Sequence, residues 1–356
     1  MNTIQRKMDT LTRDGVLPGC ALRVRRGGEI VFDSCSGYAD LENQIPVRPD
    51  TLYRICSMTK LVTAVAVMQL VERETISLDD SLLRFFPNYP ASKAKITVRH
   101  LLSHCCGMGQ GSIGERYMRA CLAPEDTLAT WIDKWGDMPL DCPVGTSAAY
   151  SPAAAFDLAG RVVEIATGQT LGEYITRNIA KPLGMKDTGF VVSDAQKPRR
   201  ARLYRGAEAG FEPVEDARSV LQFMGFEEGC GALFSTLDDF DRFTTMLYCN
   251  GELDGARIIS EETLWLMRTP EQITSDSLRP GQRWGLGFLI FEHPEWTGRK
   301  LGHFTYGWSG AFGTHMYIDP QNDLCVTLMA GREDIGGADS VASFALEEAI
   351  FESFCG

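Results

Sequence analysis

Strand-like patterns occur near both ends of the chain, and helical patterns fill the stretch between them. Apolar and polar residues alternate over residues 20–40 on either side of Gly27-Gly28, which predicts two antiparallel strands joined by a tight turn. Strand-like runs return at 285–293, 313–320 and 324–331. From Met58 to about Leu183 the apolar residues recur at helical spacing. Such a chain can build one sheet if its two ends pair, which leaves the helical stretch as an insertion.

This distribution predicts an α+β fold with two units. Residues 1–57 and 226–356 are expected to form an antiparallel sheet flanked by an N-terminal and a C-terminal helix. The first helix carries Ile4, Met8 and Leu11 on one face, and the last one covers 340–354. Residues 58–225 are expected to form a mainly helical domain. Because no linker-like segment separates the units, we expect an active site in a cleft at their interface.

Charge and cysteine content restrict the partners and the compartment. The 356 residues carry a net charge of −12, and an acidic surface repels phosphate backbones and anionic lipid. We therefore expect neither a nucleic-acid nor a membrane partner, and no apolar stretch is long enough to span a bilayer. Eleven cysteines, an odd number, together with no export signal, predict reduced thiols and a cytoplasmic protein. The sequence leaves the oligomeric state open.

The segment Ser57-Met58-Thr59-Lys60 carries the main chemical signal. It precedes a long apolar run, so Ser57 should lie at the start of a helix with Lys60 on the same face, one turn further on. Backbone N–H groups at a helix start can stabilise an oxyanion. A serine needs a base, and a lysine can serve only if burial and neighbours lower its pKa. We therefore expect a second titrating partner. The alternative is a helix-capping serine followed by a solvated lysine.

Four segments together resemble the serine β-lactamase and penicillin-binding-protein superfamily. They stand in the family's order and are SMTK at 57–60, ITVRHLLSHCCGMG at 96–109, PVGTSAAYSPAAAFDLAG at 143–160, and GHFTYGWSGAFGTHMYIDPQNDLCVTLMAG at 302–331. Within this superfamily the chain is most similar to class C β-lactamases and family VIII carboxylesterases. The resemblance runs from about residue 18 to the end and implies the fold of that family, which is the α+β arrangement described above.

The resemblance also implies roles for individual residues. Ser57 matches the nucleophile, Lys60 its partner on the helix, and Tyr150 the tyrosine that acts as general base and later protonates the leaving group. Trp308-Ser309-Gly310 matches the third motif, which contacts substrate. The backbone N–H of Ala311 is expected to complete the oxyanion hole.

Two departures from the β-lactamase pattern bear on the substrate. The second motif of β-lactamases reads Tyr-x-Asn, whereas Tyr150-Ser151 is followed here by Pro152, which has no side-chain amide. The third motif begins with Lys or His in relatives, whereas Trp308 offers only apolar area and one N–H. Both changes remove groups suited to a penicillin-like ligand, and they favour an esterase.

The sequence therefore predicts a serine hydrolase that forms an acyl-enzyme on Ser57, most simply a carboxylesterase acting on a small ester or amide. Neither a metal nor an organic cofactor is expected, because acyl transfer through a serine needs none. His100 and His104 have the spacing of a metalloprotease motif but lack its glutamate. Glycine-rich residues 227–231 are expected to form a wall of the cleft. Two alternatives remain: a β-lactamase, D-amino-acid peptidase or acyltransferase, and a catalytically idle binding or assembly module.

Overall fold

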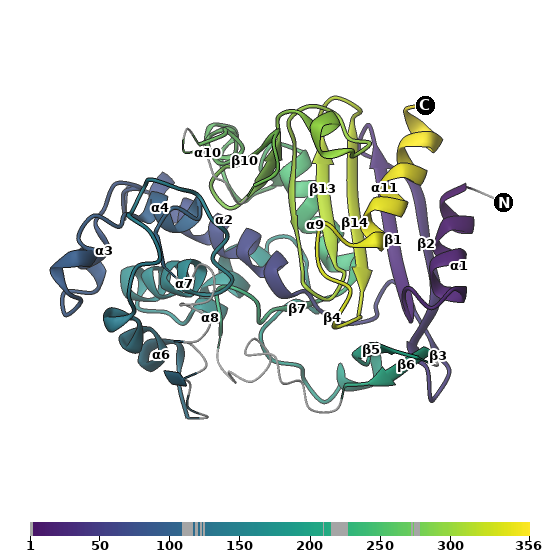
Figure 1. Cartoon of the computed structure of the whole chain (residues 1–356), viewed down its shortest axis with the longest axis horizontal. Coiled ribbons are helices and arrows are strands. Elements are labelled where there is room, and N and C mark those ends of the chain that lie inside the picture. Colours follow the sequence, from purple (N-terminus) through teal and green to yellow (C-terminus); the bar gives the residue numbers. More distant parts are fainter. Residues whose placement is uncertain are drawn as a thin grey trace.

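The computed structural model describes residues 3–108, 117, 120–121, 123, 125–208, 210–214, 227–271, 273 and 278–356. One large sheet is its centre (Figure 1), and its strands are β1 (Gly19–Arg26), β2 (Glu29–Asp40), β3 (Ile45–Pro46), β10 (Gln282–Trp284), β11 (Leu289–Phe291), β12 (Thr305–Ser309), β13 (His315–Asp319) and β14 (Leu324–Ala330). The spatial order of these strands is β10-β11-β12-β13-β14-β1-β2-β3, and all neighbouring strands are antiparallel.

The two ends of the chain pair as predicted. β1 lies beside β14 with Cys20 opposite Ala330, and beside β2 on its other side. The turn between β1 and β2 is made by Gly27 and Gly28, whose φ angles of 58° and 83° lie in the left-handed region that favours glycine. The alternation seen in the sequence therefore corresponds to a real hairpin.

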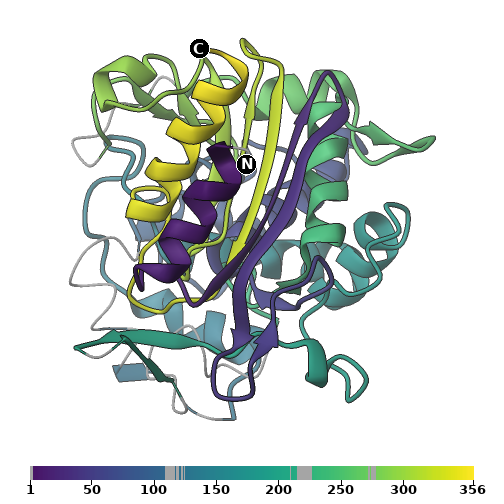
Figure 2. The same ribbon diagram turned by 90° about the vertical axis from the view of Figure 1, so that its right-hand side faces the viewer.

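Helices cover both faces of the sheet. The helices α1 (Thr3–Arg13) and α11 (Val341–Phe354) pack side by side on one face (Figure 2). α1 buries Ile4, Met8 and Leu11, the stripe that the sequence predicted. The helix α9 (Leu237–Tyr248) packs against β14 and β1 on the other face.

The central helical segment forms a group of helices beside the sheet (Figure 1). Its helices are α2 (Thr59–Glu72), α3 (Leu82–Phe85), α4 (Val98–Leu102), α6 (Leu128–Lys134), α7 (Ala154–Thr167) and α8 (Leu171–Ile175). α2 contacts both α7 and α8, and α4 and α6 pack on α7. Because α2 is surrounded, nearly all of its side chains are buried, which explains why its sequence is apolar on every side.

Short elements connect these parts. They are the pairs β4 (Tyr53–Arg54) with β7 (Phe234–Ser235), β5 (Tyr204–Ala207) with β6 (Gly210–Pro213) and β8 (Glu252–Leu253) with β9 (Ala256–Arg257), and the helix α10 (Glu261–Met267). The division at residues 57 and 226 stays a prediction. The β5–β6 hairpin falls inside the range expected to be helical, and Tyr204 forms a bridge to Arg332, two residues after β14.

The ten cysteines other than Cys142 carry free thiols. In the part of the chain that the structure describes, no helix combines the length and the apolar character needed to cross a membrane.

Candidate active site

Ser57 lies in a short 3₁₀ turn, Cys56–Met58, where the chain enters α2. Its Oγ is 3.2 Å from the Nζ of Lys60 and 2.7 Å from the phenolic oxygen of Tyr150. The structure thus brings together the three residues for which the sequence predicted catalytic roles. Cys56, just before the serine, has a φ of 47°, a conformation that residues other than glycine rarely adopt.

Lys60 is buried, with 1% of its surface exposed. Its ammonium group donates to the carbonyl oxygen of Pro152 at 2.7 Å, to that of Cys230 at 2.8 Å and to Ser57 Oγ at 3.2 Å. An ammonium group has three hydrogens, so these contacts use all of them. The alternative from the sequence, a helix-capping serine followed by a solvated lysine, does not fit, because Lys60 is buried and α2 has no side-chain cap.

Lys60 does not meet the condition under which a lysine could act as the base, because its pKa is raised and not lowered. Burial is the largest single effect and lowers this pKa. The proximity of Tyr150, Cys230 and Asp157 raises it by more in total, so the pKa of Lys60 lies above its ordinary value. Tyr150, Asp157 and Cys230 lie far from residue 60 in the sequence, so no local pattern identifies them as its neighbours. Lys60 is therefore a buried cation near neutral pH and cannot itself take the proton of Ser57.

Two buried carboxyl groups lie close enough to Lys60 for its charge to lower their pKa values. Asp157, on α7, accepts from the backbone N–H of Cys230 at 3.1 Å, and Glu228 lies 3.8 Å from the guanidinium of Arg54. Burial raises the pKa of Asp157 to about 6 and that of Glu228 to about 8. The glycine-rich loop around residues 227–231 was expected to be a wall of the cleft. Residues 227–231 do not line the cavity over Ser57, and Cys230 instead supplies a carbonyl oxygen that accepts from Lys60.

Tyr150 is held by a cluster of aromatic rings. Its ring centroid is 4.9 Å from that of His104, 5.0 Å from that of Trp308 and 6.0 Å from that of Trp284. The Nδ1 of His104 accepts from the backbone N–H of Ser151 at 3.1 Å, which fixes the loop that carries the tyrosine. Burial, and then the charge of Lys60, hold the pKa of His104 well below its usual range, so the ring is neutral.

His104 is a site residue that the sequence argument missed. Its spacing from His100 raised only the question of a metal ligand, and nothing local to residues 100–104 indicates a contact with residue 151. The sequence does hold one signal for this contact, because His104 and Ser151 both lie in segments that resemble the same family.

The end of β12 approaches the nucleophile turn very closely. Thr314 Oγ1 donates to the carbonyl oxygen of Ile55 at 3.1 Å, and the N–H of Gly310 donates to the carbonyl oxygen of Thr314 at 2.8 Å. A Cβ atom on Gly310 would overlap both Thr314 Oγ1 and the Ile55 carbonyl. Position 310 therefore requires glycine, because the backbone there lies very close to Ile55, which is two residues before Ser57.

A cavity of about 600 Å³ opens over Ser57. Its lining consists of Ser57, Ala149, Tyr150, Pro152, Leu278, Arg279, Gln282, Trp284, Leu289, Trp308, Ser309, Ala311, Gly337, Ala338 and Asp339. Trp308, Ser309 and Ala311 therefore lie where the sequence predicted contacts with substrate. Gly310 is not part of the lining, and its described contacts are the packing contacts above.

The cavity has apolar walls and a charged margin. Trp284 and Trp308 pack edge to face with centroids 4.8 Å apart. At the margin Arg279 lies 3.3 Å from Asp339, and both side chains are about half exposed. A second cavity of about 550 Å³ borders Arg54, and the described residues that line it include no serine, cysteine or histidine. The cavity over Ser57 is therefore the better candidate for an active site, because the nucleophile and Tyr150 line it.

One group of described residues could hold a metal ion. The ligand atoms of His293, Glu295 and His303 lie within 4.8 Å of one another. Glu295 and His303 are exposed, and none of the three lines the cavity over Ser57.

The chain is similar to known proteins along nearly its whole length. The family model described as Beta-lactamase matches residues 3–349. Protein Rv1367c of Mycobacterium tuberculosis (strain ATCC 25618 / H37Rv) is 31% identical, over 93% of this chain and 90% of its own length. Esterase EstB of Burkholderia gladioli is 28% identical, over 96% of this chain and 93% of its own length.

A solved structure shows the same fold. EstCE1, described as a hydrolase with promiscuous acyltransferase activity, superposes with a TM-score of 0.85 and 23% identity, over 98% of this chain and 97% of that chain. The predicted arrangement, an antiparallel sheet with terminal helices beside a helical insertion, is confirmed. Since the family model covers nearly the whole sequence, this chain belongs to the beta-lactamase family.

Proposed function

We propose that this protein is a serine hydrolase that cleaves small carboxylic esters through an acyl-enzyme on Ser57. The single observation that carries the proposal is the position of Ser57 Oγ between Lys60 Nζ at 3.2 Å and the Tyr150 oxygen at 2.7 Å, facing a cavity of about 600 Å³. A nucleophile and a base within hydrogen-bond distance, beside space for a reacting group, are what acyl transfer requires.

In the proposed first step the Tyr150 phenolate takes the proton of Ser57 while Oγ forms a bond to the carbonyl carbon. Lys60, a buried cation that also donates to Ser57 Oγ, stabilises the negative charge that develops in this step. The carbonyl oxygen becomes an oxyanion, to which the backbone N–H groups of Ser57 and Ala311 would donate. When the bond to the leaving group breaks, Tyr150 returns the proton to the departing alkoxide.

In the proposed second step water, or an acceptor alcohol, attacks the acyl group. Tyr150 takes the proton of the attacking oxygen, and the bond between Ser57 and the acyl carbon breaks. Ser57 regains a proton from Tyr150, and the carboxylic acid or the new ester leaves.

The cavity supports an ester over a penicillin-like substrate. At position 152, where the β-lactamase motif has an asparagine, Pro152 contributes only its carbonyl oxygen, and Lys60 occupies that acceptor at 2.7 Å. Trp308 presents an aromatic wall in place of a cation. These features favour a small acyl group of mainly apolar character. EstB, an esterase, is a relative along nearly the whole chain.

A second candidate function rests on Arg279. This guanidinium borders the cavity and could bind the carboxylate of a β-lactam or of a D-alanyl peptide. Asp339 lies 3.3 Å away and partly balances its charge, which makes this candidate the weaker one.

We also propose a cytoplasmic location and a small-molecule substrate. The location rests on the free thiols of the ten cysteines other than Cys142, because thiols persist in reducing compartments. The net charge of −12 makes nucleic acid an unsuitable partner.

The test compares hydrolysis of p-nitrophenyl acetate, p-nitrophenyl butyrate, nitrocefin and a D-Ala-D-Ala peptide. Intact-mass detection then locates the adduct of a fluorophosphonate probe. We expect ester hydrolysis and one adduct on Ser57, both lost in Ser57→Ala and both retained in the control Ser193→Ala, an exposed serine. Preferential turnover of nitrocefin or the peptide would favour the second candidate. Failure of every substrate together with no adduct would favour a catalytically idle module.

A further inference from the structure

Three side chains that can bind a metal ion converge on the loop between β11 and β12. The Nδ1 of His293 lies 3.2 Å from Oε1 of Glu295, and the Nε2 of His303 lies 3.8 Å from Oε2 of the same carboxylate. Two ligands of a tetrahedral Zn²⁺ ion, each about 2.0–2.2 Å from the metal, lie about 3.3 Å apart. The first contact already has this spacing, and the second needs to close by about half an ångström.

The ring of His303 is oriented as in a metal site. Its Nδ1 lies 2.7 Å from the carbonyl oxygen of Glu292. A carbonyl oxygen only accepts, so Nδ1 carries the hydrogen, and in the neutral ring, the form that binds metals, Nε2 carries the lone pair. This Nε2 is the atom that lies near Glu295. Metal-binding histidines usually donate their other N–H to a carbonyl or carboxylate group, which fixes the orientation of the ring.

The ring of His293 is held by an aromatic neighbour. It stacks on Trp296 with the ring centroids 4.2 Å apart and the planes 13° from parallel. This stacking limits the rotation of the ring while Nδ1 lies near Glu295. The side chains of His293, Glu295 and His303 are 45%, 52% and 48% exposed, so an ion can reach them from solvent and keep water as a further ligand.

Backbone contacts anchor both ends of the loop that carries these ligands. The N–H of His293 donates to the carbonyl oxygen of Gly281 at 3.1 Å, just before β10. The N–H of His303 donates to Oε1 of Gln321 at 2.8 Å, in the turn between β13 and β14. Ligands that are held in place before the ion arrives lose less conformational entropy when it binds.

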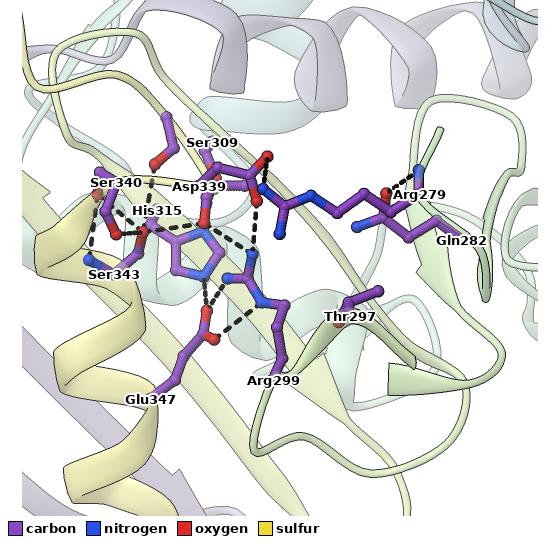
Figure 3. A network of polar contacts seen from close by, with 12 residues as sticks. Arg279, Gln282, Thr297, Arg299, Ser309, His315, Asp339, Ser340, Ser343 and Glu347 are labelled. Carbon is purple, nitrogen blue, oxygen red and sulfur yellow. Dashed lines mark hydrogen bonds and ion pairs between the residues drawn. The ribbon is translucent and has the colours of Figure 1, made fainter. Parts of the chain in front are cut away.

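The middle of the loop is anchored by Arg299, which joins a buried network (Figure 3). Its Nε donates to Oε2 of Glu347 on α11 at 2.9 Å. The Oε1 of Glu347 lies 3.0 Å from Nε2 of His315, whose Nδ1 lies 2.6 Å from Ser309 Oγ. The same guanidinium donates to the carbonyl oxygen of Ala338, which lines the cavity over Ser57. The loop is therefore fixed at its centre as well as at its ends.

From these observations we propose that His293, Glu295 and His303 bind one Zn²⁺ ion, which ties the two ends of the β11–β12 loop together. Two imidazole nitrogens and one carboxylate oxygen suit Zn²⁺, whereas Mg²⁺ and Ca²⁺ take oxygen ligands. None of the three residues lines the cavity over Ser57, and the proposed acyl transfer needs no metal. The inference is therefore independent of the proposed function.

The test measures Zn²⁺ binding to the full chain by equilibrium dialysis, together with Tm. We expect wild type to bind one more equivalent of Zn²⁺ than either His303→Gln or Glu295→Gln. Exposed thiols such as that of Cys249 also bind Zn²⁺, so the difference between the proteins is the readout, not the total. At a Zn²⁺ concentration about a hundredfold above Kd, the Tm of wild type should rise by about 3 °C or more beyond the change in either variant, because the ion binds only the folded site.

His100→Gln is the matched control, because it also removes one imidazole, and glutamine suits the capping position that His100 occupies in α4. This control should bind as much Zn²⁺ as wild type, and Mg²⁺ in place of Zn²⁺ should leave every Tm unchanged. Equal Zn²⁺ binding by wild type and both ligand variants would overturn the inference, and so would a rise in Tm that Mg²⁺ reproduces. The three side chains would then form only an ion-pair cluster.

A spectroscopic measurement identifies the ligands. Co²⁺ can replace Zn²⁺ and absorbs visible light in a site with few ligands, and thiolate ligands add a charge-transfer band in the near ultraviolet. We expect visible absorption without the thiolate band in wild type, and its loss in His303→Gln. Absorption that persists in His303→Gln contradicts the assignment. Ester hydrolysis plays no part in these measurements, so a failure of the proposed esterase function would leave their outcome unchanged.

Discussion

The phenolic oxygen of Tyr150 lies 2.7 Å from the Oγ of Ser57, although 93 residues separate the two in the chain. Ser57 enters the site at the start of α2, and Tyr150 lies just before α7. These two helices pack directly against each other, so helix packing sets the distance between the reacting oxygens. Changes that disturb this packing should affect catalysis even without touching either residue.

Tyr150→Phe removes the phenolic oxygen and keeps the ring that packs on His104 and Trp308. We expect kcat for p-nitrophenyl acetate to fall by about two or more powers of ten, the scale of general base catalysis, with little change in Tm. Tyr38→Phe, at a residue 43% exposed, serves as the control and should retain full activity. A near-normal rate in Tyr150→Phe would reduce the tyrosine to a packing residue.

Lys60→Met removes the buried cation and keeps a side chain of similar length. We expect a loss of about 10²–10³-fold in kcat, because the carbonyl groups of Pro152 and Cys230 lose their donor and Tyr150 loses the neighbouring charge. Lys93→Met is the matched control. Lys93 is also buried, at 2% exposed, and donates to the carbonyl of Met138. The control should lose stability and keep its kcat, whereas equal kinetic losses in both variants would indicate a general effect of losing a buried lysine.

Glu228 predicts a dependence of stability on pH. Burial raises its pKa from 4.5 to about 8, so between these values the folded protein keeps a proton that the unfolded chain has lost. Stability therefore decreases as the pH rises through this window. As the pH rises through this window, we expect the Tm of wild type to fall by about 2 °C or more beyond the fall in the Tm of Glu228→Gln. The scale follows from the rule that a change of about 1 kcal/mol in stability shifts Tm by about 2–4 °C in domains of moderate size.

The control for this measurement is Glu348→Gln, which removes a carboxylate from an exposed position of α11. Its Tm should follow the wild-type curve. If Glu228→Gln also follows that curve, Glu228 is ionised in the folded protein at neutral pH, and its charge is balanced by Arg54 and Lys60.

Gly310→Ala tests the close approach of β12 to the nucleophile turn. The new methyl group would overlap the Ile55 carbonyl and Thr314 Oγ1, so either the strand or the turn must move. Overpacking of this kind costs about 1–3 kcal/mol, and we expect a lower Tm together with a loss of at least about tenfold in kcat/KM. Gly189→Ala, where an added Cβ meets no atom within 4 Å, is the control and should change neither quantity. A fully active Gly310→Ala would show that this contact does not position Ser57.

Local patterns were enough to predict most of the fold. The alternation over residues 20–40 predicted the β1–β2 hairpin, and the stripe of Ile4, Met8 and Leu11 predicted α1. The spacing of Ser57 and Lys60 predicted a shared helical face, because that relationship depends on only one helical turn. The β5–β6 hairpin was not predicted, since its short strands lie within a segment dominated by helical periodicity.

The electrostatics of the site could not be predicted in the same way. The pKa of Lys60 depends on Tyr150, Asp157 and Cys230, which no local pattern connects to residue 60. The same holds for the chain from Ser309 through His315 to Glu347, whose last two members are separated by 32 residues. Contacts of this kind arise from tertiary packing, so they cannot be predicted without knowing how α11 packs on the sheet.

The pairing of β1 with β14 has a consequence for biosynthesis. β1 can pair with β2 early, but it meets its second partner, β14, only after residues up to Ala330 have been translated. Trp308, Ser309 and Ala311 likewise arrive long after Ser57 has been translated. Such distant contacts form late, so the cavity around Ser57 is incomplete in the nascent chain. We expect hydrolytic activity only after the C-terminal strands have been translated and have folded.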